Sequence, residues 1–590
     1  MCGLIGYNGT EPAAAFIISG LKKLEYRGYD SAGIATLSDG LLQYKKDIGR
    51  LEEVEAKHHL SQLPGHTGIG HVRWASHGEV NQLNAHPQLD ESSNIAVVHN
   101  GIVENASELR RHMENTYSFI STTDTEVIPF LLAQYYQQKH NMIAAIAATI
   151  KILRGPFAFL TISHYNPDSF FACAHEMPLL LGQTSTGYIA SSDTNSFPDD
   201  CSQVYALENS QIAEVSPQGF AFYDNTGYTI AKQPEALMRQ INATYVDDIE
   251  HHMMREIREQ PYVLEQAIEQ NVTDMQAAAQ AIKTAQNVIF TACGTSRHAA
   301  LMGRYLFSKI GHRMSEVIIS SELKYFSDAI SQGSVVIAIS QSGETADVLD
   351  GIRTAHAKNA KVISLINHPT SQLARLSDIV FPLKCGEENA VAATKSYMAQ
   401  ITVLTLLSHY LSGKQQHLTQ NLKSIIPLVE LAYESNLTHT ASLSRYIAEY
   451  NACYFIARGH NFHIAMEAAL KMKEVSYIHG EGMPAGELKH GTLALIEQGT
   501  PIVAICPDDY TFDDTLRNVE EARARGAFII GVSDRHHSAF NEWCKIPKVD
   551  EILYPFVSIV PLQELAYFTA LARGVNPDRP RNLAKSVTVR

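Results

Sequence analysis

The chain has 590 residues, of which 45% are hydrophobic and 18% charged, so it is expected to fold into two to four globular domains. Its formal charge is −15 and no block of consecutive basic residues occurs, which argues against nucleic acid or an acidic membrane surface as a partner. Eight scattered cysteines without a CxxC pair, no secretory signal pattern and no apolar run of membrane-spanning length predict a reducing, cytoplasmic compartment.

The first part of the chain, to about residue 224, alternates short strand patterns with a few helical stretches. A helical pattern covers residues 125–136, and strand patterns cover residues 2–7, 33–37, 95–99, 157–163 and 187–191. Runs of strands with intervening helices predict stacked sheets covered by helices in one layered α/β domain.

Cys2 lies in the opening stretch MCGLIGY, where a reactive side chain is unexpected. Once Met1 is removed, Cys2 carries a thiol and a free α-amine. An α-amino group titrates near ~8 and a thiol near ~8.5, so the amine can serve as the local base for the thiol. On position alone, an incidental buried cysteine is the commoner case.

Three downstream stretches supply partners for that thiol. In HVRWASHGEVNQLNAHP, Arg73 offers a planar fork suited to a carboxylate. In IAVVHNGIVEN, Asn100 and Gly101 follow an apolar strand, and a side-chain amide beside an unhindered backbone N–H suits an oxyanion hole. In STTDTEVI, Asp124 precedes a helix, and a helix cap is at least as good an interpretation there as a binding role.

The chain resembles the class II, N-terminal-nucleophile glutamine amidotransferases in six stretches that occur in the same order: MCGLIGY, RGYDSAGIA, RWASHG, NAHP, VVHNGIVEN and TDTEVI. The resemblance implies an αββα sandwich in which Cys2 attacks the side-chain amide of glutamine and releases ammonia. It assigns Arg73 to the glutamine α-carboxylate, Asp124 to its α-amine, Ser76 (usually Thr) and His77 to the site lining, and Asn100 and Gly101 to the oxyanion hole.

Residues 233–286 turn helical and polar, which predicts a connecting segment that packs as helices. An internal repeat follows, with three collinear matches at offsets of 165 or 166 residues: VIFTACG with CYFIARG, VIAIS with IVAIC, and AKVISLIN with GAFIIGVS. Each β-branched run is followed by a helical run. The repeat therefore predicts two tandem, doubly wound domains with parallel sheets.

The two copies differ in the loop after their second matched strand. In the first copy, VVIAISQSGETADVLDGI runs from a strand through a small polar loop into a helix. Backbone N–H groups, hydroxyls and the positive helix end make an anion site there, although ordinary capping is the alternative. The second copy has CPDDY instead, and two aspartates would repel a phosphate. Only the first copy is therefore expected to bind phosphate.

The second copy carries a different specialisation in FHIAMEAALKMKEVSYI. Glu467, Lys471 and Glu474 are spaced i, i+4 and i+7, so they share one face of the predicted helix. A solvated ion-pair face is the common outcome of such spacing. The surrounding residues are largely apolar, however, and charges on a buried helix tend to be paired or functional.

The two copies also resemble the paired sugar-isomerase domains of the glutamine–fructose-6-phosphate aminotransferase family, the glucosamine-6-phosphate synthases. The stretches that carry this resemblance are ACGTSRHAA, ISQSGET, VAATKS, ALKMKEVSYIHGEG, GELKHG and RNLAKSVTV. With the amidotransferase stretches, the resemblance covers essentially the whole chain. It implies conversion of L-glutamine and fructose 6-phosphate to glucosamine 6-phosphate, with no metal or redox cofactor. It also implies a homodimer or higher homo-oligomer of prokaryotic type.

The second resemblance assigns further roles along the chain. It makes Trp74 a gate for ammonia, and Thr295, Val391 and Glu467 sugar contacts. The phosphate is assigned to Ser296, Ser340, Gln341, Ser342 and Thr345. Catalysis is assigned to Lys471, near O5; to Glu474, moving the proton between C1 and C2; to His490, opening the ring from a neighbouring subunit; and to Lys585, forming an imine with the C2 ketone.

The expected organisation is an amidotransferase domain followed by two sugar-isomerase (SIS) domains. Its boundaries are 2–224 for the amidotransferase domain, 225–280 for a helical linker, 281–425 and 440–580 for the SIS domains, and 581–590 for a C-terminal loop. Three alternatives stay open. They are a different phosphosugar acceptor, a phosphoribosyl pyrophosphate acceptor, for which the expected acidic motif is missing, and a phosphosugar-sensing regulator, which would not need Cys2, Lys471, Glu474 and Lys585.

Overall fold

The computed structural model describes residues 2–75, 77–237 and 249–587, with side chains for all of these except 26 and 415–417. They fall into two compact units. The first unit contains the described residues up to 237 with 586–587, and the second contains residues 249–585. Each unit is described by itself.

The first unit is built on two antiparallel sheets. The eight-stranded sheet has the order β15 (Glu235–Ala236), β11 (Gln203–Ala206), β9 (Leu180–Thr184), β10 (Gly187–Ser191), β1 (Gly3–Gly9), β4 (Thr67–Arg73), β2 (Ser31–Ser38), β3 (Leu41–Ile48). The seven-stranded sheet has the order β14 (Thr229–Ile230), β13 (Gly219–Tyr223), β12 (Gln211–Ser216), β8 (Asn166–His175), β7 (Phe157–Ser163), β6 (Ile95–Gly101), β5 (Gln88–Leu89).

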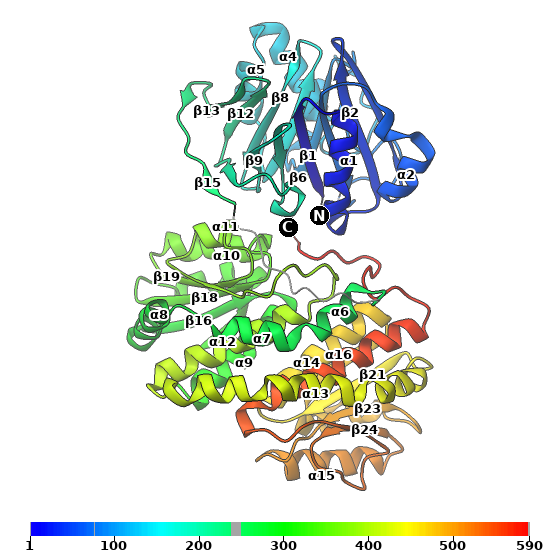
Figure 1. Ribbon diagram of the computed structural model, residues 1–590, viewed down its shortest axis with the longest axis vertical. Coiled ribbons are helices and arrows are strands. Elements are labelled where there is room, and N and C mark those ends of the chain that lie inside the picture. The colour runs from blue at the N-terminus through cyan, green and yellow to red at the C-terminus, as the bar shows by residue number, and fades with distance from the viewer. Residues whose placement is uncertain (1, 76, 238–248, 588–590) are drawn as a thin grey trace. The chain divides into compact units, whose positions relative to one another are not determined.

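Helices cover the outer faces of this pair of sheets (Figure 1). Helices α1 (Ala13–Leu24) and α2 (Leu51–His58) pack on the first sheet, and α3 (Ala106–Met113), α4 (Val127–Lys139) and α5 (Met142–Ile150) pack on the second. Between the sheets, Leu4 and Ile69 of the first meet Leu160 and Phe170 of the second in one buried core. The unit is therefore the αββα sandwich that the sequence predicted.

The second unit contains two parallel five-stranded sheets with the same strand order. The first sheet has the order β17 (Glu316–Ile319), β16 (Asn287–Ala292), β18 (Ser334–Ser340), β19 (Lys361–Ile366), β20 (Ile379–Pro382). The second has the order β22 (His479–Pro484), β21 (Ala452–Ala457), β23 (Pro501–Ile505), β24 (Phe528–Ser533), β25 (Glu542–Lys545). The predicted pair of doubly wound domains is confirmed.

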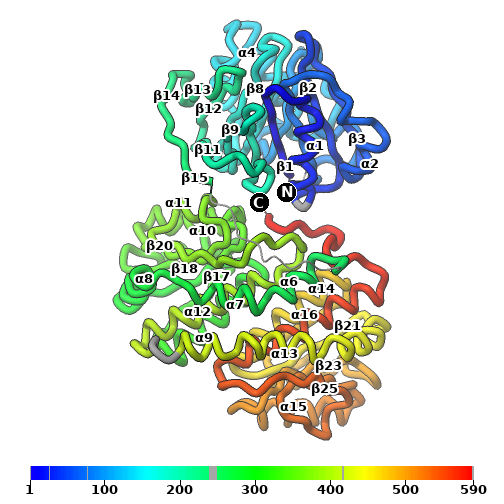
Figure 2. The backbone as a smooth tube through the Cα atoms, viewed as in Figure 1, coloured from blue at the N-terminus to red at the C-terminus, as the bar shows by residue number. Residues whose placement is uncertain are grey.

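Helices α10 (Ala346–Ala357) and α11 (Gln372–Arg375) pack in a core of the first copy, and α15 (Phe512–Arg523) packs in a core of the second. Helix α9 (Gly294–Lys309) of the first copy and α14 (Asn461–Ser476) of the second share one larger core. Helices α6 (His252–Arg258), α7 (Gln260–Ile268), α8 (Val272–Thr284) and α12 (Lys395–Ser412) pack with them, so the polar helical segment after residue 248 supplies core residues such as Met253 and Ile257. Figure 2 shows the course of the backbone through these helices.

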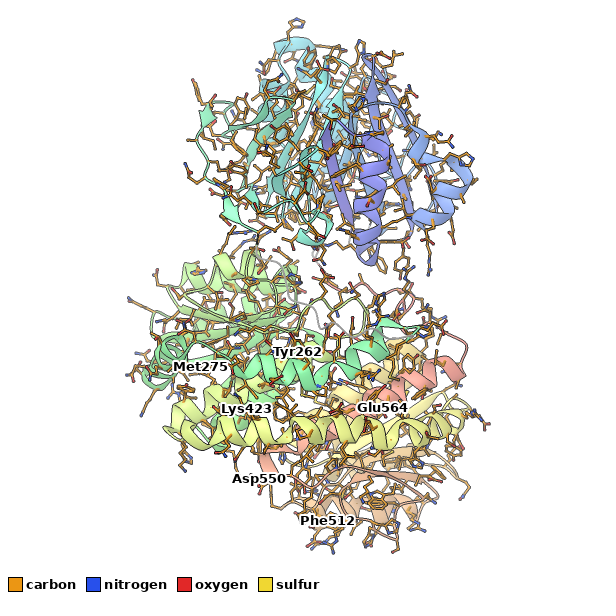
Figure 3. The ribbon with its side chains drawn as sticks, viewed as in Figure 1. Tyr262, Met275, Lys423, Phe512, Asp550 and Glu564 are labelled. Carbon is orange, nitrogen blue, oxygen red and sulfur yellow. The ribbon has the colours of Figure 1, made fainter. Side chains whose placement is uncertain are left out.

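Two long helices, α13 (Gln415–Ile447) and α16 (Tyr554–Ala572), pack along each other. Among the described residues, the segment Glu551–Ala572 alone is long and apolar enough to cross a membrane, but 83% of its apolar window is buried inside the protein, as in a core helix. Glu564 on α16 faces α13 and accepts a hydrogen bond of 3.2 Å from the Thr440 hydroxyl (Figure 3). Burial raises the pKa of Glu564 well above its usual value, so it is neutral in this core.

The strand order explains where a ligand belongs. In each copy the chain reverses direction across the sheet between the first and third strands, which in the first copy are β16 and β18. Ligands of doubly wound domains bind beyond the carboxyl ends of strands at this switch point. The loops that start α9 and α10 lie there.

Candidate active sites

The Cys2 thiol lies against the end of β4. The pairing of Gly3 with Val72 in the β1–β4 ladder brings Cys2 beside Trp74, whose backbone N–H donates to the sulfur over 3.3 Å. Burial raises the pKa of the thiol, and the Trp74 N–H and the Arg73 charge only partly offset this. The thiol is therefore protonated at rest and needs a base to become a nucleophile.

Asn100 and Gly101 end β6 next to this thiol. The Asn100 side-chain amide donates to the Cys2 carbonyl over 3.0 Å. Gly101 has φ +114°, and a Cβ there would lie 2.1 Å from the Pro156 carbonyl oxygen. Only glycine fits, because the backbone is left-handed and closely packed. The structure thus brings the Asn100 amide to the backbone of Cys2, with Gly101 next in the chain, an arrangement that suits an oxyanion hole.

Arg73 and Asp124 carry opposite charges, and both act electrostatically on the Cys2 thiol. The buried Arg73 guanidinium donates to the backbone carbonyls of His77 and Gly78. Asp124 accepts the Val103 N–H over 2.7 Å. Helix α4 begins beyond Asp124 without a side-chain cap, so the helix-cap interpretation of Asp124 is wrong.

His77, Ser76 and Trp74 are the other residues predicted for the glutamine half. The His77 side chain is exposed, and Ser76 lies outside the described residues. Trp74 is half-buried, and its ring meets the Tyr29 ring edge to face, with centroids 5.6 Å apart. The gating role of Trp74 concerns both units, so it stays a prediction.

Hydroxyl groups of the loop between β18 and α10 form hydrogen bonds within the loop. The Ser340 hydroxyl accepts the Gly343 N–H over 3.1 Å and lies 3.1 Å from the Thr345 hydroxyl. The Ser342 hydroxyl accepts the Glu344 N–H over 3.2 Å. Thr345 is the residue before the helix and does not cap it with its side chain. Gln341 lies half-buried in the same loop. Such a loop at a helix N-terminus suits an anion.

The first turn of α9 contacts α12 and the charged face of α14. The Ser296 hydroxyl accepts a hydrogen bond of 2.9 Å from Gln400 on α12. The Thr295 hydroxyl donates to Glu467 over 2.9 Å, and it accepts from the Lys471 ammonium over 2.9 Å. Residues of both copies therefore build one site, which each copy alone would lack.

Lys471 is fully buried between two carboxylates. Its ammonium lies 3.3 Å from Glu467 and 2.6 Å from Glu474. Burial alone would lower the pKa of Lys471, but the two carboxylates raise it, so the lysine keeps its charge. Glu467 is buried as well, whereas the Glu474 side chain is 22% exposed and borders a pocket of about 370 Å³. A solvated ion-pair face is thus excluded for this helix.

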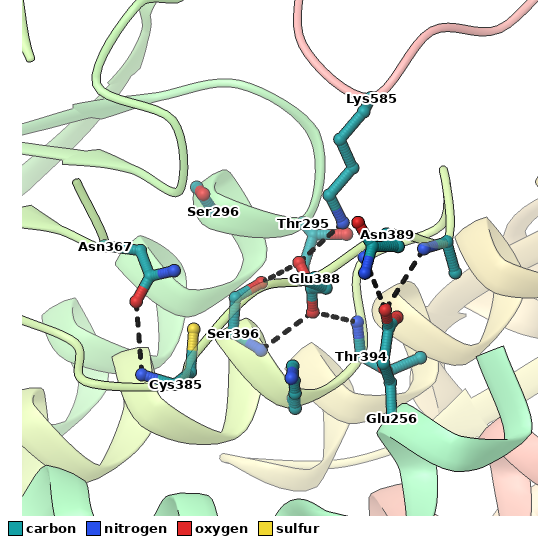
Figure 4. Close-up of polar contacts among 12 residues, drawn as sticks. Glu256, Thr295, Ser296, Asn367, Cys385, Glu388, Asn389, Thr394, Ser396 and Lys585 are labelled. Atoms are coloured by element: carbon teal, nitrogen blue, oxygen red, sulfur yellow. Dashed lines mark hydrogen bonds and ion pairs between the residues drawn. The ribbon is translucent and has the colours of Figure 1, made fainter. Parts of the chain in front are cut away.

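Lys585 enters the same unit from the end of the chain. Its ammonium forms an ion pair of 2.6 Å with Glu388, and both side chains are buried (Figure 4). Glu388 also accepts from the backbone N–H groups of Thr394 and Ser396 and from the Ser396 hydroxyl. Burial would raise the pKa of Glu388, but Lys585 and these donors lower it to about 2.

Val391 lies on the segment that carries Glu388. Its backbone N–H donates to the Asp578 carbonyl over 3.2 Å, and the Asp578 carboxylate accepts the N–H groups of His252 and Met253 at the start of α6. These contacts fix the C-terminal loop against the segment around Val391. They bring Lys585 to the sugar-isomerase half of the chain.

Comparison with known proteins follows the same division. The family model of the SIS domain matches residues 281–410 and 446–573, and that of the glutamine amidotransferase domain matches 73–198. A glutamine–fructose-6-phosphate aminotransferase (isomerizing) from Thermococcus kodakarensis is 40% identical, and the alignment covers 100% of both chains. One from Aquifex aeolicus is 37% identical with the same coverage. The chain belongs to the glutamine–fructose-6-phosphate aminotransferase family.

A solved structure supports the fold of the second unit. The C-terminal domain of glucosamine-fructose-6-phosphate aminotransferase from Francisella tularensis is 33% identical, with a TM-score of 0.54, and covers 57% of this chain and 100% of its own. The family and the fold class predicted from the sequence are therefore confirmed. The individual residue roles stay predictions.

Sequence reasoning missed the acidic partners of Lys585. Glu388 lies in a stretch without a helical or strand period, and its only sequence signal was the acidic pair in GEENA before VAATKS. Glu256 lies in the predicted helical segment, where nothing in the sequence marked it as buried. Glu256 on α6 accepts the backbone N–H groups of Asn389 and Ala390. His298 was missed as well, although it lies one turn after the Gly of ACGTSRHAA and bonds Glu467 over 2.7 Å.

His490 lies apart from the buried charges of the second unit. It ends the short 3₁₀ helix η5 (Ala485–His490), its side chain is exposed, and it makes no hydrogen bond or ion pair with the rest of the described chain. This position does not bring it to Lys471, Glu474 or Lys585 within one chain.

Glu256 makes stability depend on pH. Burial, with the Glu388 charge, raises the pKa of Glu256 from 4.5 to about 8. The native state therefore holds a proton that the unfolded state releases, and the free energy of unfolding should fall by about 1.4 kcal/mol per pH unit between these values. Glu256→Gln removes this dependence. We expect its melting temperature to fall less than that of the wild type from pH 6 to pH 8.

The exposed Glu265 on α7 gives the matched control, because Glu265→Gln changes the same group on a neighbouring helix without burial. Its melting temperature should follow the wild-type curve. Equal slopes for wild type and Glu256→Gln would show that Glu256 is already ionised at pH 6.

Proposed function

We propose that the protein hydrolyses L-glutamine to glutamate and ammonia, passes the ammonia to fructose 6-phosphate and isomerises the product to glucosamine 6-phosphate. The observation that supports the proposal is that the second unit combines a hydroxyl-lined loop at a helix N-terminus, the ion pair of the buried Lys471 with the partly exposed Glu474, and the ion-paired Lys585. In the first unit the Asn100 amide donates to the backbone carbonyl of Cys2, which supports glutamine as the source of ammonia. The relatives are named for this reaction.

In the glutamine half, Arg73 binds the α-carboxylate and Asp124 the α-amine of the substrate. The Cys2 amine takes the thiol proton, the sulfur attacks the side-chain carbonyl, and Asn100 with Gly101 stabilises the oxyanion. Loss of ammonia leaves a thioester, which water hydrolyses to glutamate. Ser76 and His77 line this pocket, and Trp74 gates the departure of ammonia.

In the sugar half, the phosphate binds to Ser296, Ser340, Gln341, Ser342 and Thr345, and the sugar to Thr295, Val391 and Glu467. Lys585 condenses with the C2 ketone and releases water, and ammonia then displaces the lysine from the imine. Glu474 removes a proton from C1 and returns it to C2, which converts the fructosimine to the aldose. Lys471 assists near O5, and His490 opens the ring.

We assign these steps to domains at 2–224, 281–425 and 440–580, with a linker at 225–280 and the imine lysine in a C-terminal loop at 581–590. The linker is not helical throughout as predicted, because β14 and β15 extend the sheets of the first unit and its first described helix, α6, begins at His252. The reaction needs soluble substrates that are found in the cytoplasm. We therefore propose that the protein is cytoplasmic. We further propose a homodimer in which His490 of one subunit serves the other. The exposed position of His490 supports this arrangement.

Two substitutions separate the half-reactions. Cys2→Ala removes the nucleophile, so glutamine-dependent synthesis should fall by about 10³-fold or more while synthesis from ammonium salts persists. Lys585→Ala should lose synthesis from either nitrogen source while glutamine hydrolysis persists. Glucosamine 6-phosphate and glutamate are measured separately. Robust product formation by Lys585→Ala would refute the imine, and persistent hydrolysis by Cys2→Ala would refute the nucleophile.

Gly343 tests the phosphate loop. It has φ +67°, and a Cβ there would lie 2.1 Å from the Ser371 hydroxyl oxygen and 2.5 Å from Ser371 Cβ. Gly343→Ala should therefore displace the loop and raise KM for fructose 6-phosphate by about tenfold or more, with glutamine hydrolysis unchanged. Gly413→Ala is the control, since Gly413 has φ +72° and nothing within 4 Å. An unchanged KM in Gly343→Ala would remove the loop from phosphate binding.

Mixed dimers test the role of His490. Suppose that each site combines Lys585 of one subunit with His490 of the other. A dimer of one Lys585→Ala chain and one His490→Ala chain then keeps one intact site. Random association of the two inactive chains should then restore about a quarter of wild-type synthesis. If His490 acts within its own chain, both sites are broken and co-expression restores nothing.

A further inference from the structure

His71 lies under the predicted oxyanion hole, at a point where the two sheets of the first unit meet. It is in the middle of β4, paired with Leu4 of β1, and its side chain is fully buried. Its Nε2 lies 3.1 Å from the Asn100 side-chain oxygen and 3.0 Å from the His99 carbonyl oxygen. Asn100 ends β6 in the other sheet, so this contact crosses the interior of the sandwich.

The two neighbours of Nε2 fix its protonation. A carbonyl oxygen accepts hydrogen bonds and cannot donate, so Nε2 carries the hydrogen and shares it between its two partners. Nδ1 is the bare nitrogen of the ring, and within the described structure it is buried without a hydrogen-bond partner. Burial lowers the pKa of His71 to about 3, and the nearby Arg73 and His99 act in the same direction. The ring is neutral throughout the working pH range.

This hydrogen decides which way the Asn100 amide faces. With its oxygen held by His71, the amide nitrogen faces Cys2 and donates to the Cys2 carbonyl over 3.0 Å. If the amide were flipped, its NH2 group would face the Nε2–H of His71 and its oxygen would face the Cys2 carbonyl oxygen. Donor would then meet donor and acceptor would meet acceptor, and both contacts are buried. An oxyanion hole works only with the nitrogen on the thiol side.

We propose that His71 is a positioning residue for glutamine hydrolysis, whose Nε2–H locks the Asn100 amide in the orientation that stabilises the oxyanion. The inference rests on the glutamine hydrolysis proposed above. Nothing in it requires His71 to touch the substrate. Its effect should therefore appear in the chemical step and disappear when Asn100 has no amide.

The test compares steady-state glutamine hydrolysis by His71→Leu and His71→Gln. Leucine fills the space without a donor, and we expect kcat to fall about 10- to 100-fold, less than loss of a whole oxyanion donor because the Cys2 carbonyl still favours the correct orientation. KM for glutamine should stay within about threefold, because Arg73 and Asp124 are untouched. Glutamine carries an amide N–H at a similar reach, so His71→Gln should recover most of the lost kcat.

A double-mutant cycle separates positioning from general damage to the core. In the Asn100→Ala background, His71→Leu should cost no further activity, because the group on which it acts is gone. Alkylation of Cys2 by iodoacetamide, which forms no oxyanion, should proceed at the wild-type rate. A parallel loss of kcat and alkylation in His71→Leu, or a full additional loss on top of Asn100→Ala, would overturn the proposal.

His86 provides the matched control. Its ring lies in the same buried layer, with its centroid 4.2 Å from that of His71, but its Nδ1 accepts the His99 N–H and makes no recorded contact with Asn100. His86→Gln should keep kcat within about threefold, as expected for a core change outside the oxyanion hole. A loss equal to that of His71→Leu would assign the effect to the buried layer as a whole.

The tautomer gives a readout that does not depend on activity. In ¹⁵N-histidine-labelled protein, the His71 signal, assigned by its absence from His71→Leu, should show a neutral ring with hydrogen on Nε2 from pH 5 to pH 8. A Nδ1–H tautomer, or titration in this range, would overturn the proposal even if the protein proved inactive toward glutamine. Failure of Cys2→Ala to abolish hydrolysis would instead count against the proposed function alone.

Discussion

The arrangement of the second unit depends on the buried carboxylate of Glu467. This group accepts hydrogen bonds from Thr295 and His298 of the first SIS copy and pairs with Lys471 of the second. Burial would raise the pKa of Glu467, but the Lys471 charge and these donors lower it. Removing one partner would leave an uncompensated charge in the core, which costs about 3–5 kcal/mol. The two copies are therefore joined by a contact that neither can satisfy alone.

The two copies of the repeated fold are specialised in different ways. Both copies place a loop and a helix N-terminus at the switch point of an identical strand order. In the first copy, hydroxyl groups line the loop and leave it suited to an anion. In the second, the Asp509 carboxylate accepts the backbone N–H and the hydroxyl of Thr511, both over 2.7 Å, at the start of α15. A carboxylate of the chain itself takes the place of the anion, and α14 is left to supply Lys471 and Glu474.

The strands of the repeat and the polar loop were predictable because continuous β-branched runs and a strand–loop–helix pattern are local signals. Glu388 was not, because it meets Lys585 across 197 residues of sequence, in an irregular segment whose burial only tertiary packing determines. The helices after residue 248 show the same limit. Their pattern predicted helices correctly, but no local signal revealed that Met253 and Ile257 belong to the core of the second unit. Asp124 was ambiguous for the same reason, because the Val103 N–H that donates to it is distant in the sequence.

In the proposed mechanism, each nucleophile, Cys2 or Lys585, must lose a proton before it reacts. Burial raises the pKa of the Cys2 thiol in the first unit, and Lys585 forms an ion pair with the Glu388 carboxylate in the second. The fold thus supplies geometry in advance, but reactivity requires a proton to leave each nucleophile. At Cys2 the proposed base is the amine of the same residue. At Lys585 it is the paired carboxylate, whose pKa of about 2 rises once the ammonium charge beside it is lost. A substrate that displaces water from either site strengthens these interactions, so binding and activation are coupled through the same buried charges.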